Sequence, residues 1–113
     1  MKKLIITTAL LAFSSLTQAG NYATCLLDKL PGLQNDQAAA AAIQVCRSKH
    51  PGGMEQIAQG EKRGAFGYES GAECALKKAG ETRSSTAAYQ IRLACDRLYD
   101  EPTGLFDDLR ADQ

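Results

Sequence analysis

The chain has 113 residues, with 13 basic and 13 acidic side chains, one histidine, four cysteines and no tryptophan. This even balance gives no electrostatic basis for binding nucleic acid or an anionic membrane across a whole face. With so few large apolar residues, a chain of this length forms a small core of marginal stability, which usually needs additional support.

Residues 1–19 are typical of a cleaved secretory signal peptide. Lys2 and Lys3 form a positive n-region, residues 4–13 are apolar apart from two threonines, and small residues precede a cleavage site after Ala19. The apolar run is shorter than the about 20 residues that cross a bilayer, so we expect no stable membrane insertion.

Cleavage would leave 20–113 as a single helical domain, with 11 basic residues against 13 acidic ones and a net charge near −2. An even number of cysteines in a short exported chain indicates a disulfide framework. Zinc sites and redox pairs use cysteines that are close in sequence, which these are not, so we expect no metal site. The disulfide candidates are Cys25, Cys46, Cys74 and Cys95.

An internal repeat organises the chain. Cys25 and Cys46 have the same separation as Cys74 and Cys95. When the first half of the chain is aligned with the second so that these cysteines coincide, Leu27 falls on Leu76. Further matches are Ala23 on Ala72, Lys29 on Lys78, and Ala38-Ala39 on Ala87-Ala88. The sequence therefore predicts two copies of one unit, at 21–51 and 70–102, joined by a glycine-rich bridge at 52–69.

The first unit is predicted to be a helical hairpin. Helical spacing begins at Tyr22 and stops at Pro31, and either Asn35 or Asp36 caps a second helix. That helix carries an alanine run and ends before Pro51.

The second unit follows the same order of signals. Ser70 and Glu73 fit a capping box, and Gly80 marks the end of the helix that they begin. Ser84 or Ser85 caps the last helix, which stops before Pro102. No segment of the chain has a convincing strand pattern.

The position of each cysteine favours disulfides within the units. Cys25 lies about five residues before its helix ends, and Cys46 lies about nine residues after the next helix begins. The two cysteines therefore differ in height by about one helical turn, which the connecting loop has to absorb. The second unit has the same offset, so we predict Cys25–Cys46 and Cys74–Cys95. The expected fold is all-α, with two disulfide-stapled helical hairpins forming a small four-helix domain.

Residues for catalysis are scarce. His50 is the single histidine and is expected to be a cation at a helix end, because a general base needs a positioned partner. The adjacent pairs Asp107-Asp108 and Asp100-Glu101 are typical of solvated surface. No cofactor motif is present, so we predict no catalytic residue and no cofactor.

The bridge contains the candidate partner-binding residues, which are Lys62, Arg63, Phe66 and Tyr68. Two interpretations remain open. The aromatic residues either fill the core beneath a tight glycine path or form an exposed basic-aromatic loop that contacts a partner. We favour the first, because aromatic side chains so often carry core packing.

The C-terminal tail, 103–113, places Leu105, Phe106 and Leu109 among acidic residues. The sequence leaves open whether the tail docks on the domain or serves as a short partner-binding segment.

These patterns favour a non-catalytic binding or interaction module, exported to the periplasm or secreted, whose partner is an unknown protein or envelope component. The second hypothesis is a secreted effector, or an inhibitor or immunity-type protein, which localisation of the mature chain would distinguish. The third is a small hydrolase, which predicts that His50→Ala abolishes turnover without unfolding the chain.

Overall fold

The computed structural model describes residues 20–64 and 67–102. Within these ranges the chain is helical and contains no strand. The elements are α1 (Tyr22–Lys29), α2 (Asp36–Lys49), a short 3-10 helix η2 (Gly53–Gln56), α3 (Gly71–Ala79) and α4 (Ser85–Tyr99). The segments 1–19 and 103–113, to which we assigned a signal peptide and a tail, lie outside the described residues. No helix in the described ranges is both long enough and apolar enough to span a membrane.

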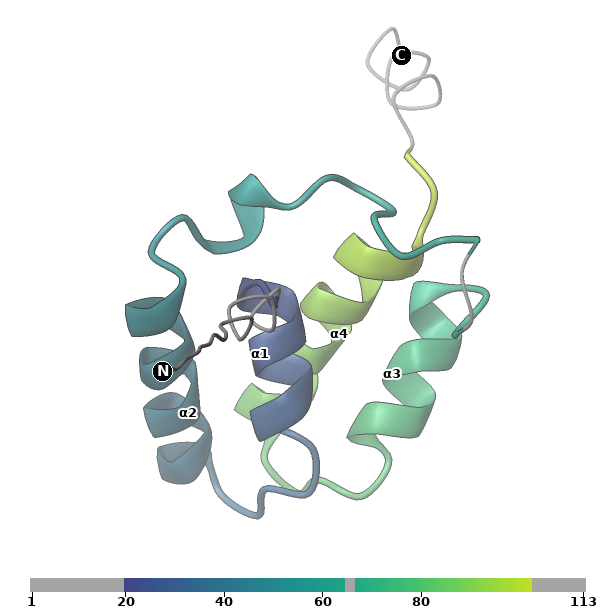
Figure 1. The fold of residues 1–113 in the computed structure, drawn as a ribbon. Helices are drawn as coiled ribbons and strands as arrows, with labels where there is room; N and C mark the ends of the chain where they lie inside the picture. Colours follow the sequence, from purple (N-terminus) through teal and green to yellow (C-terminus); the bar gives the residue numbers. More distant parts are fainter. Residues whose placement is uncertain (1–19, 65–66, 103–113) are drawn as a thin grey trace, which may run out of the picture.

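The helices are arranged as two hairpins placed side by side (Figure 1). α1 pairs with α2, and α3 pairs with α4. The two hairpins meet through α1 and α4, which occupy the centre, while α2 and α3 flank them. The all-helical fold and the pair of hairpins agree with the sequence prediction.

Each α-helix begins at a polar side chain that accepts a hydrogen bond from the backbone N–H three residues later. Such a bond satisfies one of the N–H groups that the first turn leaves without a helical partner. The capping residues are Asn21, Asn35, Ser70 and Ser84.

The capping boxes differ from the prediction. The start of α1 has a complete box that was not predicted, in which Asn21 accepts from the Thr24 N–H and Thr24 Oγ1 accepts from the Asn21 N–H. At α3, the Ser70 hydroxyl accepts from the Glu73 N–H as predicted. The Glu73 carboxylate, however, accepts from the Glu69 N–H, 2.8 Å away, instead of from the Ser70 N–H. The predicted box at α3 is therefore only half correct.

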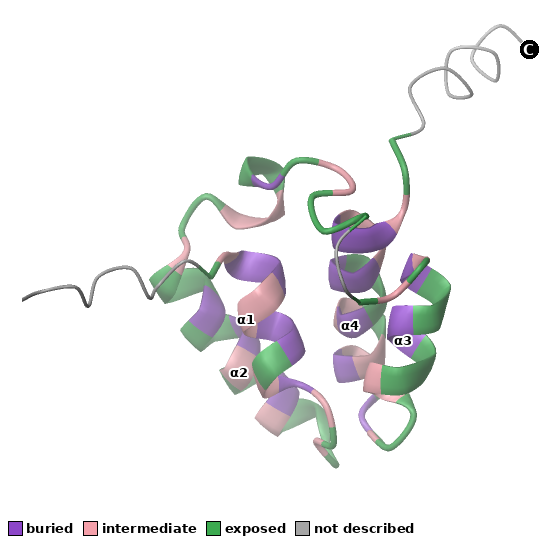
Figure 2. Cartoon of the chain, turned by 45° about the vertical axis from the view of Figure 1, so that its right-hand side comes forward, coloured by how far each residue is buried: buried purple, intermediate pink, exposed green. Residues whose placement is uncertain are grey.

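The core lies between the facing sides of α1 and α4, and it also takes in side chains from α2, α3 and the bridge (Figure 2). Its largest fully buried apolar side chains are Leu26, Leu30, Ile57, Ile91 and Leu98. The outward sides of α2 and α3 are mostly exposed, as expected for helices with one apolar face.

Both predicted disulfides are present. Cys25 pairs with Cys46 and Cys74 with Cys95, at Cα–Cα distances of 5.7 and 5.6 Å. Each disulfide joins the two helices of one hairpin and closes a sequence separation of 21 residues. In the chain-entropy account, each loop of this length stabilises the fold by about 3 kcal/mol.

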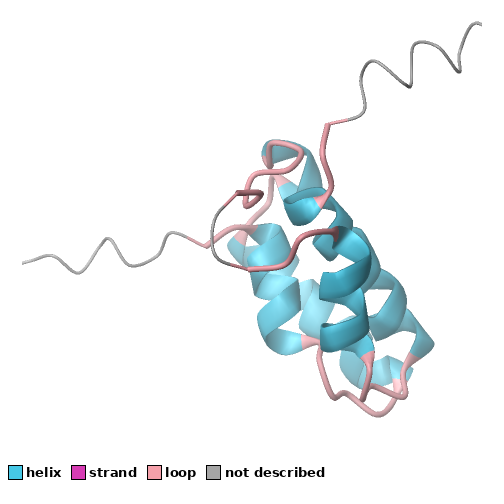
Figure 3. Ribbon diagram, turned by 90° about the vertical axis from the view of Figure 1, so that its right-hand side faces the viewer, coloured by secondary structure: helices cyan, strands magenta, loops and turns pink. Residues whose placement is uncertain are grey.

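The loops within the two hairpins lie together at one end of the bundle (Figure 3). The Arg83 N–H donates to the Leu33 carbonyl, 2.9 Å away, and the Thr82 hydroxyl donates to the same oxygen. The bridge crosses the opposite end of the bundle, where α2 and α4 finish.

Candidate functional site

The bridge is attached to the C-terminal end of α4 by its own polar groups. The Gly60 and Lys62 N–H groups donate to the carbonyls of Arg97 and Leu98, at 2.8 and 2.9 Å. The Gln59 side-chain amide donates to the carbonyls of Asp96 and Asp100, at 2.8 and 3.0 Å. The Arg97 and Leu98 carbonyls belong to the final turn, where carbonyls lack a partner within the helix, so the bridge supplies these hydrogen bonds. The Asp96 carbonyl also accepts from the Asp100 N–H.

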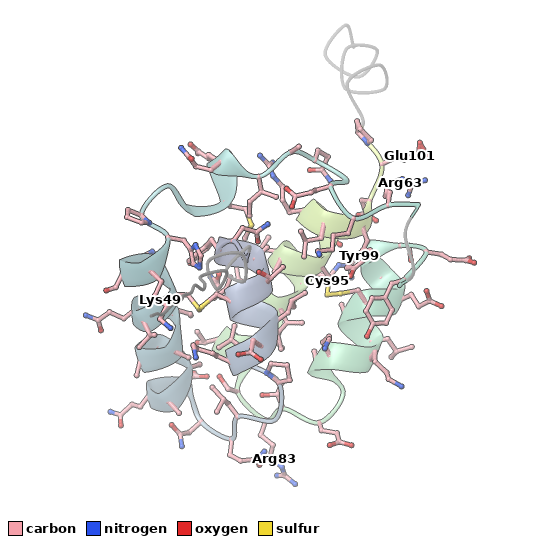
Figure 4. All side chains as sticks on the ribbon, viewed as in Figure 1. Lys49, Arg63, Arg83, Cys95, Tyr99 and Glu101 are labelled. Carbon is pink, nitrogen blue, oxygen red and sulfur yellow. A yellow bond between two sulfur atoms is a disulfide. The ribbon has the colours of Figure 1, made fainter. Side chains whose placement is uncertain are left out.

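Arg63, one of the predicted partner-binding residues, belongs to this attachment. Its Nη1 donates to the Tyr99 carbonyl, 3.0 Å away, and Figure 4 places Arg63 and Tyr99 at the same end of the molecule. The guanidinium thereby also places a cation at the negative end of the α4 dipole. Arg63 nevertheless remains largely exposed.

The end of α4 also binds the start of α3. The Asp100 carboxylate accepts from the Gly71 N–H, 2.7 Å away. Gly71 has no side chain, and a Cβ at this position would lie 2.7 Å from the Asp96 Cα. The two helices therefore approach closely because a glycine stands at their crossing point.

Tyr68 stands where the bridge meets α3 and α4. Its ring packs edge-to-face on the ring of Tyr99, with centroids 5.3 Å apart, and it lies against the core while remaining half-buried. Burial, and secondarily the neighbouring Tyr68 phenol, raises the pKa of Tyr99 above its ordinary value of 10.0. Tyr68 is thus partly a core residue, as one of the two interpretations of the bridge predicted.

Two open cavities flank Tyr68. The first, of about 560 Å³, lies between α1 and the bridge, and its lining includes Lys62 and Lys78. The second, of about 810 Å³, runs along α3 past Leu76 and Lys77. Acidic side chains contribute to both cavities, Asp28 to the first and Glu73 and Glu81 to the second. We call the residues Lys62, Tyr68, Leu76, Lys77 and Lys78 the Tyr68 surface.

Leu76, Lys77 and Lys78 of this surface were not predicted from the sequence, and the apolar one among them is Leu76. Its side chain is 78% exposed, although it occupies the position in α3 that corresponds to the buried Leu27 in α1. The spacing gave no signal of this exposure, because Leu27 follows Cys25 in α1 as Leu76 follows Cys74 in α3, and Leu27 is buried.

The four predicted partner-binding residues are therefore not equivalent. Lys62 is exposed and lines a cavity, Arg63 is exposed and bonded to α4, and Tyr68 is half-buried between two cavities. Phe66 lies outside the described residues.

His50 caps the C-terminal end of α2, and its backbone N–H donates to the Cys46 carbonyl, 2.9 Å away. His50 lines a small cavity whose other described lining residues include Lys49 and Gln56 and no carboxylate. Within the described ranges, no cluster of three or more histidine, cysteine or acidic residues is arranged to hold a metal ion.

No family model matches this chain, and comparisons with curated proteins and with solved structures give no significant match.

Proposed function

We propose that this chain is an exported, non-catalytic binding module that contacts a protein of the cell envelope through the Tyr68 surface. The observation that carries the proposal is the pairing of a 78% exposed Leu76 with the half-buried Tyr68 at the edge of one open cavity. An exposed apolar side chain that borders a partly buried aromatic ring is typical of the centre of a protein interface.

The surroundings of these two residues also support a binding surface. Charged side chains of both signs line the cavities around this apolar pair, which fits the usual arrangement of a polar rim around an apolar core. They are Lys62, Lys77, Lys78, Asp28, Glu73 and Glu81. The scaffold beneath is held by two disulfides and by the bonds between the bridge and α4. A surface fixed in this way loses little conformational entropy when it binds.

Export is part of the proposal. Two disulfides suit an oxidising compartment, and the composition of 1–19 supports a signal peptide that is removed after Ala19. The intact mass of the exported protein should correspond to a chain that starts at Gly20. A mature protein that retains the apolar stretch 4–13 would contradict this part of the proposal and indicate a membrane tether.

We further propose that the two hairpins are copies of one unit. The support is the equal separation of the paired cysteines, together with the matched alanine and lysine positions in the sequence. In this view, the different surroundings of Leu27 and Leu76 reflect the different places of α1 and α3 in the bundle, and the binding surface developed on the exposed copy.

The binding surface is tested by Leu76→Ser, compared with Val45→Ser as a matched control. Both residues are exposed aliphatic side chains on helices, and Val45 lies on α2, away from the Tyr68 surface. Each change should alter the free energy of unfolding by no more than about 0.5 kcal/mol, as is usual for surface positions. The oxidised protein, immobilised and exposed to envelope extract, should lose its bound protein in Leu76→Ser and keep it in Val45→Ser.

The double variant Phe66→Ala/Tyr68→Ala then separates a binding role of the bridge from a packing role. Emptying a buried aromatic site costs about 3–5 kcal/mol, so a large loss of stability with binding retained would assign both rings to the core. A variant that keeps its melting temperature and loses binding supports the proposal. Equal binding by Leu76→Ser and by the unaltered protein would refute it.

A further inference from the structure

A third open cavity, of about 760 Å³, lies between the C-terminal part of α2, η2 and α4. It shares no residue with the two cavities of the Tyr68 surface. We call it the α2–α4 groove, and the function proposed above makes no use of it.

The groove combines an apolar lining with basic side chains. Tyr22, Met54 and Leu93 supply the apolar part, and Leu93 is 37% exposed. The charged groups are the basic Arg47 and Arg97 and the acidic Glu55 and Asp96.

The charges in the groove do not cancel. Asp96 is already engaged by Arg92, whose Nε lies 2.9 Å from its Oδ1. Arg97 donates through Nε to the Ile57 carbonyl, which leaves its charge uncompensated, and no acidic group of the described residues forms an ion pair with Arg47. The groove therefore presents two arginines against Glu55 and favours an occupant that is both apolar and acidic.

We propose that residues 103–113 of the same chain occupy the α2–α4 groove. This segment has the required composition, because Leu105, Phe106 and Leu109 flank the adjacent carboxylates of Asp107 and Asp108. The apolar side chains then lie on Met54 and Leu93, and the carboxylates face Arg47.

The position of Pro102 places this segment within reach of the groove. A Cβ built on Gly60 would lie 3.4 Å from the Pro102 Cδ, so the chain leaves the described part beside the bridge. Gln59, the neighbour of Gly60, both lines the groove and donates to the Asp100 carbonyl. An extended chain covers about 3.3–3.6 Å per residue, so Leu105 and Phe106 can extend about 10–14 Å from Pro102, which lies next to the edge of the groove that Gln59 lines.

Nuclear Overhauser effects in the oxidised protein test this contact. The ring protons of Phe106 should show cross-peaks to the methyl groups of Leu93 or Met54. Arg47→Glu should abolish these cross-peaks, because it places a carboxylate opposite the acidic segment. Adding Asp107→Lys and Asp108→Lys to Arg47→Glu should restore them by reversing both sides of the pair.

Lys77→Glu is the control, since it reverses a basic residue on α3, outside the groove, and should leave the cross-peaks unchanged. Helical circular dichroism and the absence of free thiols establish that each variant is folded. Absence of cross-peaks in the unaltered protein would overturn the proposal. So would cross-peaks that appear only between differently labelled molecules in a mixed sample, because the occupant would then be the tail of a second copy.

Discussion

Gly60 shows how one residue fixes the path of the bridge over α4. Its φ of +77° lies in the left-handed region, and a Cβ there would stand 2.9 Å from the Asp100 carbonyl oxygen. Both the backbone conformation and the close approach would therefore strain any other residue at this position. Because Gly60 lies so close to the end of α4, its N–H can donate to the Arg97 carbonyl.

Gly60→Ala should destabilise the protein by about 1–3 kcal/mol, the range for a strained backbone position, with a further contribution from the displaced carbonyl. Gly64→Ala is a matched control, because Gly64 has a φ of +83° and a Cβ added there would meet no atom within 4 Å. Urea denaturation should therefore show a larger loss for Gly60→Ala than for Gly64→Ala. Equal losses of stability would mean that only the positive φ is strained by alanine. The close approach of Gly60 to the Asp100 carbonyl would then contribute nothing.

At the scale of elements, Asp36 links the two hairpins. It is the first residue of α2, and its carboxylate accepts from the Ser84 hydroxyl and from the Thr86 N–H at the start of α4. Ser84 is buried and also caps α4, so its hydroxyl both donates to Asp36 and accepts from the Ala87 N–H. The two helices therefore begin from one shared set of hydrogen bonds.

This contact makes part of the stability depend on pH. The hydrogen bond from Ser84, followed by that from Thr86, lowers the pKa of the Asp36 carboxyl below its ordinary value of 3.8. A carboxyl with a lowered pKa in the folded state contributes stability above its unfolded pKa, and this contribution is lost as the pH falls through the folded value. Asp36→Asn should therefore lower the urea midpoint at about pH 7, and the difference from the unaltered protein should shrink towards about pH 2. Asp28→Asn, at an exposed acid of α1, is the control for removing a carboxylate from a helix surface.

The sequence predicted the elements of this fold better than the way they pack. Proline, glycine and capping residues are local signals, so the helix ends and the cysteine pairs followed from spacing. The short helix η2 was missed because the glycines around it indicated only a turn. The exposure of Leu76 was missed because Leu27 and Leu76 follow their cysteines at the same spacing but have different neighbours, and only the tertiary arrangement shows that α1 is central and α3 peripheral.

In the candidate site, too, the sequence predicted residues that are close along the chain and missed the contacts between distant ones. Lys62, Arg63 and Tyr68 were found as a local cluster of basic and aromatic residues, but the attachment of Arg63 to Tyr99 joins residues 36 positions apart. No local pattern contains such a contact. The two cavities beside Tyr68 likewise depend on where the bridge, α1 and α3 come together.

At the scale of the whole molecule, the two disulfides close equal loops but contribute unequally to holding their helices. The buried residues of α1 are Tyr22, Ala23, Leu26 and Leu27. Those of α3 are Gly71, Cys74 and Ala75. A fully buried leucine contributes about 1.5–3 kcal/mol, so apolar burial holds α1 in place far more strongly than α3. The Cys74–Cys95 bond therefore supplies a larger share of what keeps α3 on the bundle.

Removing each disulfide should consequently have a different local effect. Cys74→Ala/Cys95→Ala should cost about 2–5 kcal/mol and make the amides of α3 exchange with solvent much faster than those of α1. Cys25→Ala/Cys46→Ala removes a bond that closes the same separation of 21 residues, so it should cost a similar free energy in the chain-entropy account, while α1 keeps its protection through Leu26 and Leu27. Hydrogen exchange of both double variants, read helix by helix, measures this difference. α1 and α3 could instead lose amide protection equally when their own disulfides are removed. Apolar burial would then not be what holds α1 more strongly than α3, and the central position of α1 would have to be stabilised by its contacts with the bridge.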